Sequence, residues 1–373
     1  MLFSILVFIL ILSVLILVHE LGHFLVAKKS GIWVEEFGFG IPPRIIGKKV
    51  GETIYSINLF PFGGFVRLHG EITEEGISKP DRAFLNKNKR TRFAVIVAGV
   101  VSNFLLAIAA FSLIYTFTGI PKPAETGQVK VVGIAQNSPA SQVGLMEGDI
   151  LKSVQGQGLS QADEFTERVS QFKGKEITVS IERNGEIVSY SITPRENPPS
   201  GEGPIGVAIS SVDINYTFPP IWQRPFIGVY FGFKEALFWG GAVILGLGKM
   251  IANLFSGIVP KDIAGPAGLF VVTTEAQKAG FFALINLLGI ISVNLAILNI
   301  FPFPALDGGR LLFLAIEGVF GKRIVPKIEA AVHATGLVIL IFLILLVTIR
   351  EVRLIRSLGF NGYLEYMSQG VPQ

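Results

Sequence analysis

Two histidines and a glutamate, in the sequence His19-Glu20-Leu21-Gly22-His23, are the residues whose types and spacing suggest chemistry. On a helix, H-E-x-x-H places two imidazoles at i and i+4 on one face, close enough to bind one metal ion, with a carboxylate beside them. The motif lies inside an apolar run from Leu2 to Ala27, and ionisable groups in a membrane segment are costly and retained mainly for function. The sequence therefore predicts a Zn²⁺ site in a membrane helix; the alternative is a soluble core helix that carries the pattern by chance.

A third ligand must come from elsewhere, because catalytic zinc usually takes three protein ligands and one water. Of the remaining histidines, His69 lies in a polar loop and is expected to be solvated, and His333 begins the last apolar segment, where we expect an interfacial or helix-capping role. Asp307 is the stronger candidate, since prolines and glycines around it break the helix, and irregular backbone at membrane depth needs a cavity or protein partners. The alternative for Asp307 is an interfacial carboxylate that caps a turn.

These residue types indicate hydrolysis. Bound zinc lowers the pKa of water to about 7, which supplies a nucleophile near neutral pH. Glu20 is placed to accept the proton of that water and pass it to a leaving amine. His19 precedes Lys28 by nine residues, so it lies about 13 Å of helix rise below the boundary of the apolar run. Water must reach that depth, and a polar cavity open to the cytoplasm is therefore expected.

Composition indicates an integral membrane protein with some soluble mass. Of 373 residues, 50% are hydrophobic and 16% charged, whereas soluble proteins carry about 25% charge. The absence of cysteine excludes a disulfide framework, a thiolate metal site and a cysteine nucleophile. The net charge of +4 is explained by basic residues beside membrane spans, so it indicates no nucleic-acid partner.

The apolar segments predict about four transmembrane helices, at 1–27, 93–117, 281–310 and 333–350. The loop 28–92 is rich in Lys and Arg, which the positive-inside rule places in the cytoplasm. The N-terminus, the segment 122–215 and the tail 351–373 are then extracytoplasmic, although the arginines of the tail run against the rule.

The segment 221–262 is ambiguous, because its apolar part, 226–259, is interrupted by Lys234, Glu235 and Lys249. A further membrane crossing there would put Asp307 on the opposite face from the two histidines. We therefore expect amphipathic helices at the outer interface.

Residues 122–215 are expected to form a compact α+β domain. Turn signals such as Asn184-Gly185 separate short β-type runs. One helix, Ser160–Phe172, is expected to begin at an N-cap serine. The expected strands are Val129–Ile134, Ile177–Glu182, Ile187–Ile192 and Ile205–Ile209.

The H-E-x-x-H span and the late N-x-x-P-x-P-x-L-D-G-G run, Asn299–Gly309, together resemble a bacterial site-2 protease, in the regulator-of-sigma-E protease branch of the M50-like zinc intramembrane metalloproteases. The resemblance covers essentially the whole chain. It implies zinc ligands His19, His23 and Asp307, with Glu20 as the catalytic base. It also implies that Asn299 and Pro302 handle unwound substrate and that Asn294 is a further motif residue. Gly99–Asn103 matches the G-x-x-x-N motif of the family, for which close helix packing is an equally good explanation.

Two further segments carry the resemblance. Pro61–Leu68, with Gly63 and Gly64, is similar to a membrane-associated β-hairpin loop that offers an edge to an extended substrate; an ordinary cytoplasmic hairpin is the alternative. Residues 122–215 resemble a circularly permuted PDZ domain. There Ile205, Gly206 and Val207 would hold a peptide carboxylate, unless the domain only blocks access. Some relatives carry two such domains, and this length fits one.

The implied fold is a polytopic α-helical membrane protein with an inserted PDZ-like domain. The implied activity is zinc-dependent cleavage, in the bacterial inner membrane, of single-span proteins such as anti-sigma factors and remnant signal peptides. The partners are those substrates and the lipid bilayer. A non-catalytic PDZ scaffold is one alternative, disfavoured by the intact Glu20. A zinc transporter is another, disfavoured because the chain shows no internal repeat.

Overall fold

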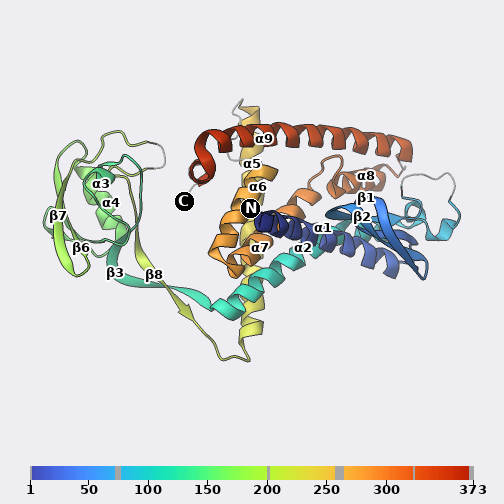
Figure 1. Cartoon of the computed structure of the whole chain (residues 1–373), viewed down its shortest axis with the longest axis horizontal. Helices are drawn as coiled ribbons and strands as arrows, with labels where there is room; N and C mark the ends of the chain where they lie inside the picture. Colours follow the sequence, from blue (N-terminus) through green and yellow to red (C-terminus); the bar gives the residue numbers. More distant parts are fainter. Residues whose placement is uncertain (1, 72–76, 200–201, 257–263, 322–323, 369–373) are drawn as a thin grey trace. The chain divides into compact units, whose positions relative to one another are not determined.

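The computed structural model describes residues 2–71, 77–199, 202–256, 264–321 and 324–368. The chain divides into two compact units, each described by itself. Gly119–Pro219 forms one unit, called here the inserted domain, and the chain on either side of it forms the other, called the helical unit (Figure 1).

The helical unit contains a hairpin and, in the described residues, seven helices of more than ten residues. The helices are α1 (Leu2–Lys29), α2 (Lys89–Thr118), α5 (Arg224–Phe255), α6 (Pro266–Ala279), α7 (Phe281–Ile300), α8 (Asp307–Phe320) and α9 (Pro326–Ser368), and the strands are β1 (Val34–Val50) and β2 (Thr53–Leu68). Two short 3-10 turns, η1 (Pro80–Arg82) and η2 (Phe84–Asn86), precede α2.

Within the described residues, five helices are long and apolar enough to cross a membrane, whereas the sequence predicts about four. The additional one lies in α5, where short interfacial helices were expected and one continuous 32-residue helix is found. Two of the charged residues that interrupt the apolar run, Glu235 and Lys234, have partners in the structure. Glu235 accepts hydrogen bonds from Tyr115 Oη (2.9 Å) and Trp239 Nε1 (3.0 Å). Lys234 lies 5.6 Å from the centre of the Tyr230 ring. Because these groups have partners, they do not end the helix.

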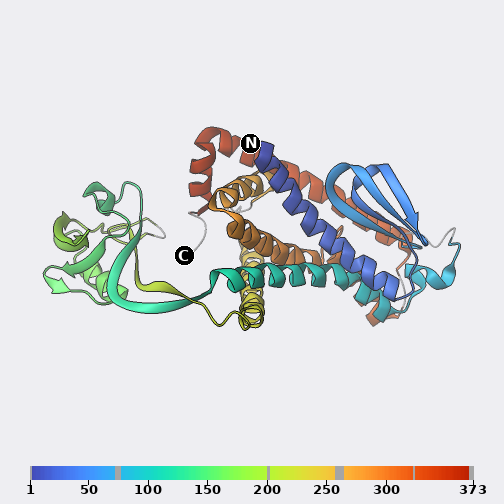
Figure 2. The same ribbon diagram turned by 60° about the horizontal axis from the view of Figure 1, so that its bottom comes forward.

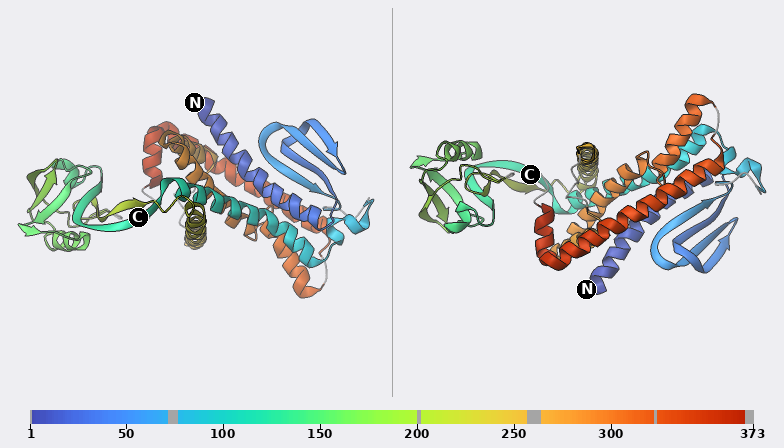
Figure 3. Two further views of the ribbon diagram at one scale, coloured as in Figure 1. Left: turned by 90° about the horizontal axis from the view of Figure 1, so that it is seen from below. Right: turned by 90° about the horizontal axis from the view of Figure 1, so that it is seen from above.

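The end of α7 differs from the expected span 281–310. The helix ends at Ile300, and α8 begins only at Asp307, with the prolines Pro302 and Pro304 in the connection. The last helix is longer than the expected 333–350, since α9 runs from Pro326 to Ser368 with a bend at Gly359 (φ 71°), visible in Figure 3.

The hairpin packs beside the second half of α1 (Figure 2). Helix α1 ends at Lys29, followed by Gly31 at φ 66°, and the chain returns as β1, which pairs antiparallel with β2. Apolar side chains from α1, the hairpin and α2 form one core, which includes Phe24, Ala27, Val34, Leu68 and Val95. This core fixes the polar half of α1 against α2. A hairpin within 28–92 is thus found, while its position relative to a bilayer stays a prediction.

The inserted domain is a sheet with a short helix packed on it. The strand order is β7-β6-β4-β3-β8, with β5 paired to β4 and every pair antiparallel. The strands are β3 (Ile120–Ile134), β4 (Ile150–Val154), β5 (Gln157–Gly158), β6 (Ile177–Arg183), β7 (Glu186–Ile192) and β8 (Val207–Thr217), and the helices are α3 (Pro139–Gln142) and α4 (Ala162–Gln171).

Several details of this domain differ from the predicted elements. The first strand begins at Ile120 rather than Val129, and β4 and β5 were not predicted. The last strand begins at Val207, so Ile205 and Gly206 precede it. The N-cap of α4 is Gln161, and Ser160 instead donates its backbone N–H (3.1 Å) and hydroxyl (3.0 Å) to the Glu164 carboxylate. The serine still stabilises the start of the helix, through a reciprocal bond to the first turn.

Candidate metal centre

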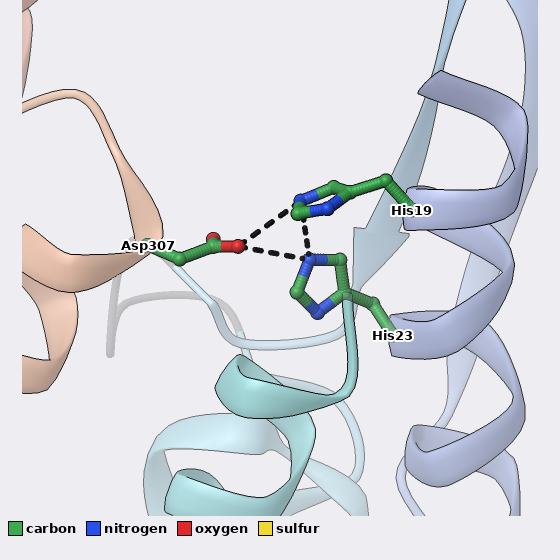
Figure 4. Close-up of side chains that lie close together, drawn as sticks. All are labelled: His19, His23 and Asp307. Carbon is green, nitrogen blue, oxygen red and sulfur yellow. Dashed lines mark hydrogen bonds and ion pairs between the residues drawn. The ribbon is translucent and has the colours of Figure 1, made fainter. Parts of the chain in front are cut away.

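His19, His23 and Asp307 meet at one point, although 284 residues separate the histidine motif from the aspartate. His19 Nε2 lies 3.0 Å and His23 Nε2 3.3 Å from Asp307 Oδ2 (Figure 4). The two histidine Nε2 atoms are 3.2 Å apart. The histidines come from adjacent turns of α1 and the aspartate from the first residue of α8. Two elements far apart in the sequence therefore build a single cluster.

The geometry fits a tetrahedral zinc ion. Zinc binds imidazole nitrogen and carboxylate oxygen at about 2.0–2.2 Å, which puts two ligands of a tetrahedron about 3.3–3.5 Å apart. The three contacts observed here, 3.0 to 3.3 Å, are close to that spacing. Asp307 Oδ2 is also buried without a hydrogen-bond partner among the described residues. A shared cation would satisfy three ligand atoms that otherwise face one another.

Hydrogen bonds on the far side of the rings select the ligand nitrogens. His23 Nδ1 lies 2.7 Å from Val95 O, a carbonyl that can only accept, so Nδ1 carries the proton and Nε2 is free to bind metal. His19 Nδ1 lies 3.4 Å from the side-chain amide of Asn103, which is fully buried. Nitrogen and oxygen of a carboxamide have the same shape, and with Oδ1 turned toward His19 the amide accepts that proton as well. Both rings then present Nε2 to the centre.

Gly99 lets α2 approach these rings. A Cβ at this position would lie 2.4 Å from His23 Nε2 and 2.6 Å from His19 Cε1. In the G-x-x-x-N segment, the glycine thus makes room for the metal-binding face of α1, and Asn103 contacts one of its histidines. Close helix packing is therefore observed at this motif, and a direct catalytic part for it stays a prediction.

The glycines after Asp307 let α8 begin tightly against the connection that precedes it. A Cβ on Gly308 would lie 2.0 Å from Phe301 O, and one on Gly309 would lie 2.6 Å from Phe303 O. Ala305 adopts φ 84°, a backbone conformation that residues other than glycine rarely adopt. This strained turn delivers Asp307 to the histidines.

A cavity of about 360 Å³ surrounds the cluster. Glu20 lines it beside the metal ligands, as the motif predicts. Its other walls come from β2, α8 and α9, through Phe65, Val66, Leu68, Arg310, His333, Ala334 and Leu337 among others. A neighbouring cavity of about 270 Å³ shares five lining residues with it and adds Arg92, Glu317 and Glu329. Polar groups therefore line both cavities beside the centre, and an opening of these cavities to the cytoplasm stays a prediction.

The predicted substrate-handling residues lie at different distances from the cavity. Gly64 is on β2, where a Cβ would lie 3.7 Å from Glu20 Cγ, and Gly63 beside it has φ 89° and faces Ile16 of α1. Asn299 lies in the last turn of α7 and Pro302 is exposed in the connection, and neither lines the cavity. Asn294 donates to Ile290 O of its own helix (3.2 Å).

The expectation for His69 was wrong. His69 is 5% exposed rather than solvated, because its Nδ1 pairs with Glu35 Oε1 (2.7 Å) and its ring packs on Trp33. His333 does not cap the end of a helix in the described chain, and its position relative to a membrane interface stays a prediction. It lies inside α9, accepts a hydrogen bond from Ala305 N (3.0 Å) and lines the cavity of the metal centre. The signal for it was an ionisable residue within an apolar span, which is a functional candidate by default.

Arg310 was also missed. It follows Asp307 by one helical turn and forms an ion pair with Glu71, which lies just after β2. This pair joins the base of the hairpin to the helix that carries the third ligand. Nothing in the spacing of the two residues along the chain indicates it.

In the inserted domain, the predicted carboxylate loop lies at the start of an edge strand. Gly206 adopts φ 74°, Ile205 O accepts from Ala140 N (3.0 Å), and Gly206 N donates to Gly203 O (3.0 Å). β8 is the last strand of the sheet and contacts α4. An extended peptide has room to pair only where a strand leaves one edge open, and β8 is such a strand.

Comparisons with known proteins bear on the whole chain. The model of Peptidase family M50 matches residues 7–343. A relative from Clostridium perfringens, whose name assigns it to the zinc metalloproteases, is 33% identical over 88% of this chain and 92% of its own length. The zinc metalloprotease RasP of Geobacillus kaustophilus is 29% identical over 91% of this chain and 95% of its own length.

One solved structure resembles a segment of the chain. It is the PDZ domain of the SdrC-like protein from Listeria monocytogenes, with 20% identity, a TM-score of 0.21 and coverage of 23% of this chain and 90% of that domain. With the family match spanning both the histidine motif and Asp307, the chain belongs to peptidase family M50 and is a metalloprotease of the site-2 protease type.

Proposed function

We propose that this protein is a zinc-dependent intramembrane endopeptidase that hydrolyses peptide bonds within the transmembrane segments of single-span proteins. One observation carries the proposal: ligand atoms from α1 and α8 converge within 3.3 Å of one another, and the cavity around them also contains Glu20. A scaffold has no use for this arrangement. A transporter needs access from both sides and usually two repeated halves, and the sequence shows no repeat.

The residues divide the chemistry between them. His19, His23 and Asp307 would hold zinc, which when bound supplies the Lewis acidity that makes water a nucleophile near neutral pH. Glu20 takes the proton of the attacking water and returns it to the amine that leaves. Val95 and Asn103 keep the two imidazoles oriented through their Nδ1 atoms.

β2 is suited to hold the substrate. A transmembrane helix keeps its amides in its own hydrogen bonds, so the scissile segment must unwind before it can be cleaved. In the described chain β2 pairs with β1 alone, so its second edge can accept an added strand. Phe65 and Val66 of β2 line the cavity, and Gly64 lies next to Glu20. A strand added there would pass beside the catalytic base.

The substrates we propose are anti-sigma-factor-like proteins already trimmed on the outer side and remnant signal peptides. The proposed role of the inserted domain is to bind an exposed peptide end at the β8 edge, with Ile205, Gly206 and Val207 at its carboxylate. A domain that only blocks access to the bilayer is the competing role.

We place the chain in a bacterial inner membrane, with the metal centre toward the cytoplasm. The charged loop 28–92 supports that orientation, which leaves the N-terminus and the inserted domain outside. Because Asp307 contacts the histidines near the inner end of α1, α7 must begin outside and end inside. The chain between α2 and α7 then crosses an even number of times, so either α5 does not cross fully or the segment after it returns.

Co-expression with a tagged single-span reporter tests the activity. Glu20→Gln removes the base and is expected to lower cleavage by about 10²–10⁴-fold, and Asp307→Asn is expected to abolish cleavage together with zinc binding. Glu167→Gln and Asp163→Asn, both exposed on α4, are matched controls that should cleave normally. Reporter cleavage that is unchanged in Glu20→Gln would rule the proposal out. Zinc flux into proteoliposomes without cleavage would favour the transporter instead.

A further inference from the structure

His333 is a polar residue of α9 beside the metal centre that the mechanism above does not use. Its ring lines both neighbouring cavities and packs 5.7 Å from the ring of Phe313. Its Nδ1 accepts a hydrogen bond from Ala305 N at 3.0 Å. Its Nε2 is buried and has no hydrogen-bond partner among the described residues.

The bond to Ala305 fixes the position of the proton. A backbone N–H can only donate, so Nδ1 must present a lone pair. A neutral imidazole then carries its one proton on Nε2, which makes Nε2–H a donor. A buried donor that lacks an acceptor costs about 1–3 kcal/mol, and such a group in a native structure requires an explanation.

Close packing around the His333 ring holds it in one position. A Cβ on Gly309 would lie 3.1 Å from His333 Cε1, and one on Gly336 would lie 2.4 Å from Pro304 Cβ. Glycines on α8 and α9 thus let α9 lie directly against the α7–α8 connection. Ala305, which donates to the ring, is itself strained at φ 84°. Backbone strain and an unsatisfied polar group at one place are typical of a site that acts on a ligand.

His333 is poorly suited to be a fourth metal ligand. Its Nδ1 is occupied by the Ala305 N–H, and its Nε2 carries the proton. The ligand atoms that do converge belong to His19, His23 and Asp307, within 4.8 Å of one another. The ring that carries this N–H lines a hydrolytic cavity. A neutral N–H donor there has a different use, because it can stabilise negative charge as it develops on a substrate oxygen.

We propose that His333 is a catalytic residue that donates its Nε2–H to the carbonyl oxygen of the scissile peptide bond. The inference rests on the proposed proteolytic function. When the water oxygen bonds to the carbonyl carbon, the π electron pair of the carbonyl moves to its oxygen, and the His333 N–H stabilises that negative charge while keeping its proton. Glu20 takes one water proton and passes it to the amide nitrogen, the C–N bond breaks, and the products are a carboxylic acid and an amine. The second water proton then moves from the acid to the amine, which leaves a carboxylate and an ammonium group.

Two substitutions separate this role from that of holding the turn. In His333→Asn, the side-chain oxygen takes the place of Nδ1 and still accepts from Ala305 N, but no donor remains at the position of Nε2. In His333→Gln, an amide N–H lies near the position of Nε2. Thr335→Val, an exposed change one-half turn along α9, is the control.

For His333→Asn we expect unchanged zinc content, a KM within about twofold of wild type and a kcat lower by about 10²–10³-fold, the loss seen when one oxyanion donor is removed. His333→Gln should recover part of that loss. A second readout is independent of turnover: a phosphonamidate peptide, whose charged oxygens imitate the developing oxyanion, should lose affinity for His333→Asn in titration calorimetry by a similar factor. An uncleaved ground-state peptide should bind equally well.

Three results would overturn the inference. A kcat for His333→Asn within twofold of wild type shows that the donor is not used. Loss of zinc or of the folded state in His333→Asn shows that the ring only supports the turn before Asp307. Equal loss of affinity for the phosphonamidate and the ground-state peptide shows a binding role without charge stabilisation. Failure of the wild type itself to bind zinc or to cleave would instead overturn the proposed function, and this inference with it.

Discussion

At the scale of single residues, the metal centre depends on what surrounds its ligands. His23 is oriented by a backbone carbonyl and His19 by the amide of Asn103. Both partners belong to α2, so a helix without metal ligands determines which nitrogen each ring presents. Partners of this kind typically contribute 10–100-fold to metal affinity. The specificity of the centre is therefore distributed over α1, α2 and α8.

Gly99→Ala should remove metal binding while leaving the fold in place. The added methyl would lie 2.4 Å from His23 Nε2 and 2.8 Å from His19 Nε2, so α2 and the rings must separate. We expect zinc per purified chain to fall at least tenfold by elemental analysis. Gly241→Ala on α5, where a Cβ meets nothing within 4 Å, is the matched control and should keep its zinc. Equal zinc in both variants would show that α2 does not shape the centre.

At the scale of elements, sequence reasoning worked where a spacing or a breaker residue carries the signal. H-E-x-x-H fixes two ligands on one turn of helix, and the prolines before Asp307 mark the end of α7. That break also made Asp307 the candidate for the third ligand. The hairpin was implied by the family resemblance of Pro61–Leu68, and strands of the inserted domain were predicted from short β-type runs and turn residues.

The errors have a common cause, because each depended on a partner far away in the chain. Glu235 suggested a broken helix, but it accepts a hydrogen bond from Tyr115, which is 120 residues away in the chain. His69 was expected to be solvated, but Glu35 and Trp33 cover its ring in the structure. His333 accepts a hydrogen bond from Ala305 N, which lies in another part of the chain. Such pairings arise from tertiary packing and leave no periodic signal in the sequence.

The inserted domain should lose stability in acid through one buried carboxylate. Burial alone would raise the pKa of Asp149, but hydrogen bonds from Arg183 (2.7 Å to each oxygen) and from Met146 N (2.8 Å) lower its pKa below the usual value. A carboxyl whose folded-state pKa is depressed stabilises the fold above its unfolded-state value and loses that contribution as pH falls through the folded-state value. The stability of the domain should therefore decline below about pH 4.

Labelling of a buried cysteine measures this. Since the chain has no cysteine, Val179→Cys in the core of the domain reports its opening through the rate of thiol modification. Relative to the labelling rate of an exposed cysteine at the same pH, the rate should rise between pH 4 and pH 3 in the Val179→Cys background. Adding Asp149→Asn should produce faster labelling already at pH 7, because the buried side chain can no longer accept charged hydrogen bonds from Arg183. Asp163→Asn should not have this effect. A pH-independent rate would contradict the role of Asp149.

At the scale of the whole molecule, the contact between α1 and α8 constrains topology. In the proposed membrane topology, both sites face the same leaflet, and α7 starts on the side opposite to the loop 28–92. Five helices are long enough to span, and the contact therefore limits how α5 and α6 can be arranged between α2 and α7. A measurement of the topology therefore also tests whether the metal centre can form.

Single cysteines in intact cells test that arrangement. Lys278→Cys, at the end of α6, should react with a membrane-impermeant maleimide added outside, and Lys49→Cys, beside the hairpin turn, should react only after the membrane is opened. Ser256→Cys then shows whether α5 crosses. A cytoplasmic Lys278→Cys would place the start of α7 on the wrong side for the contact described here.

The most direct test of the central claim is X-ray absorption at the zinc edge on the purified chain. The account predicts one zinc per chain, four-coordinate, with two imidazole nitrogens and carboxylate and water oxygens at about 2.0–2.2 Å. It also predicts loss of one imidazole in His23→Ala and loss of zinc in Asp307→Asn. A chain without stoichiometric zinc, or a zinc shell that is the same in wild type and Asp307→Asn, would contradict it.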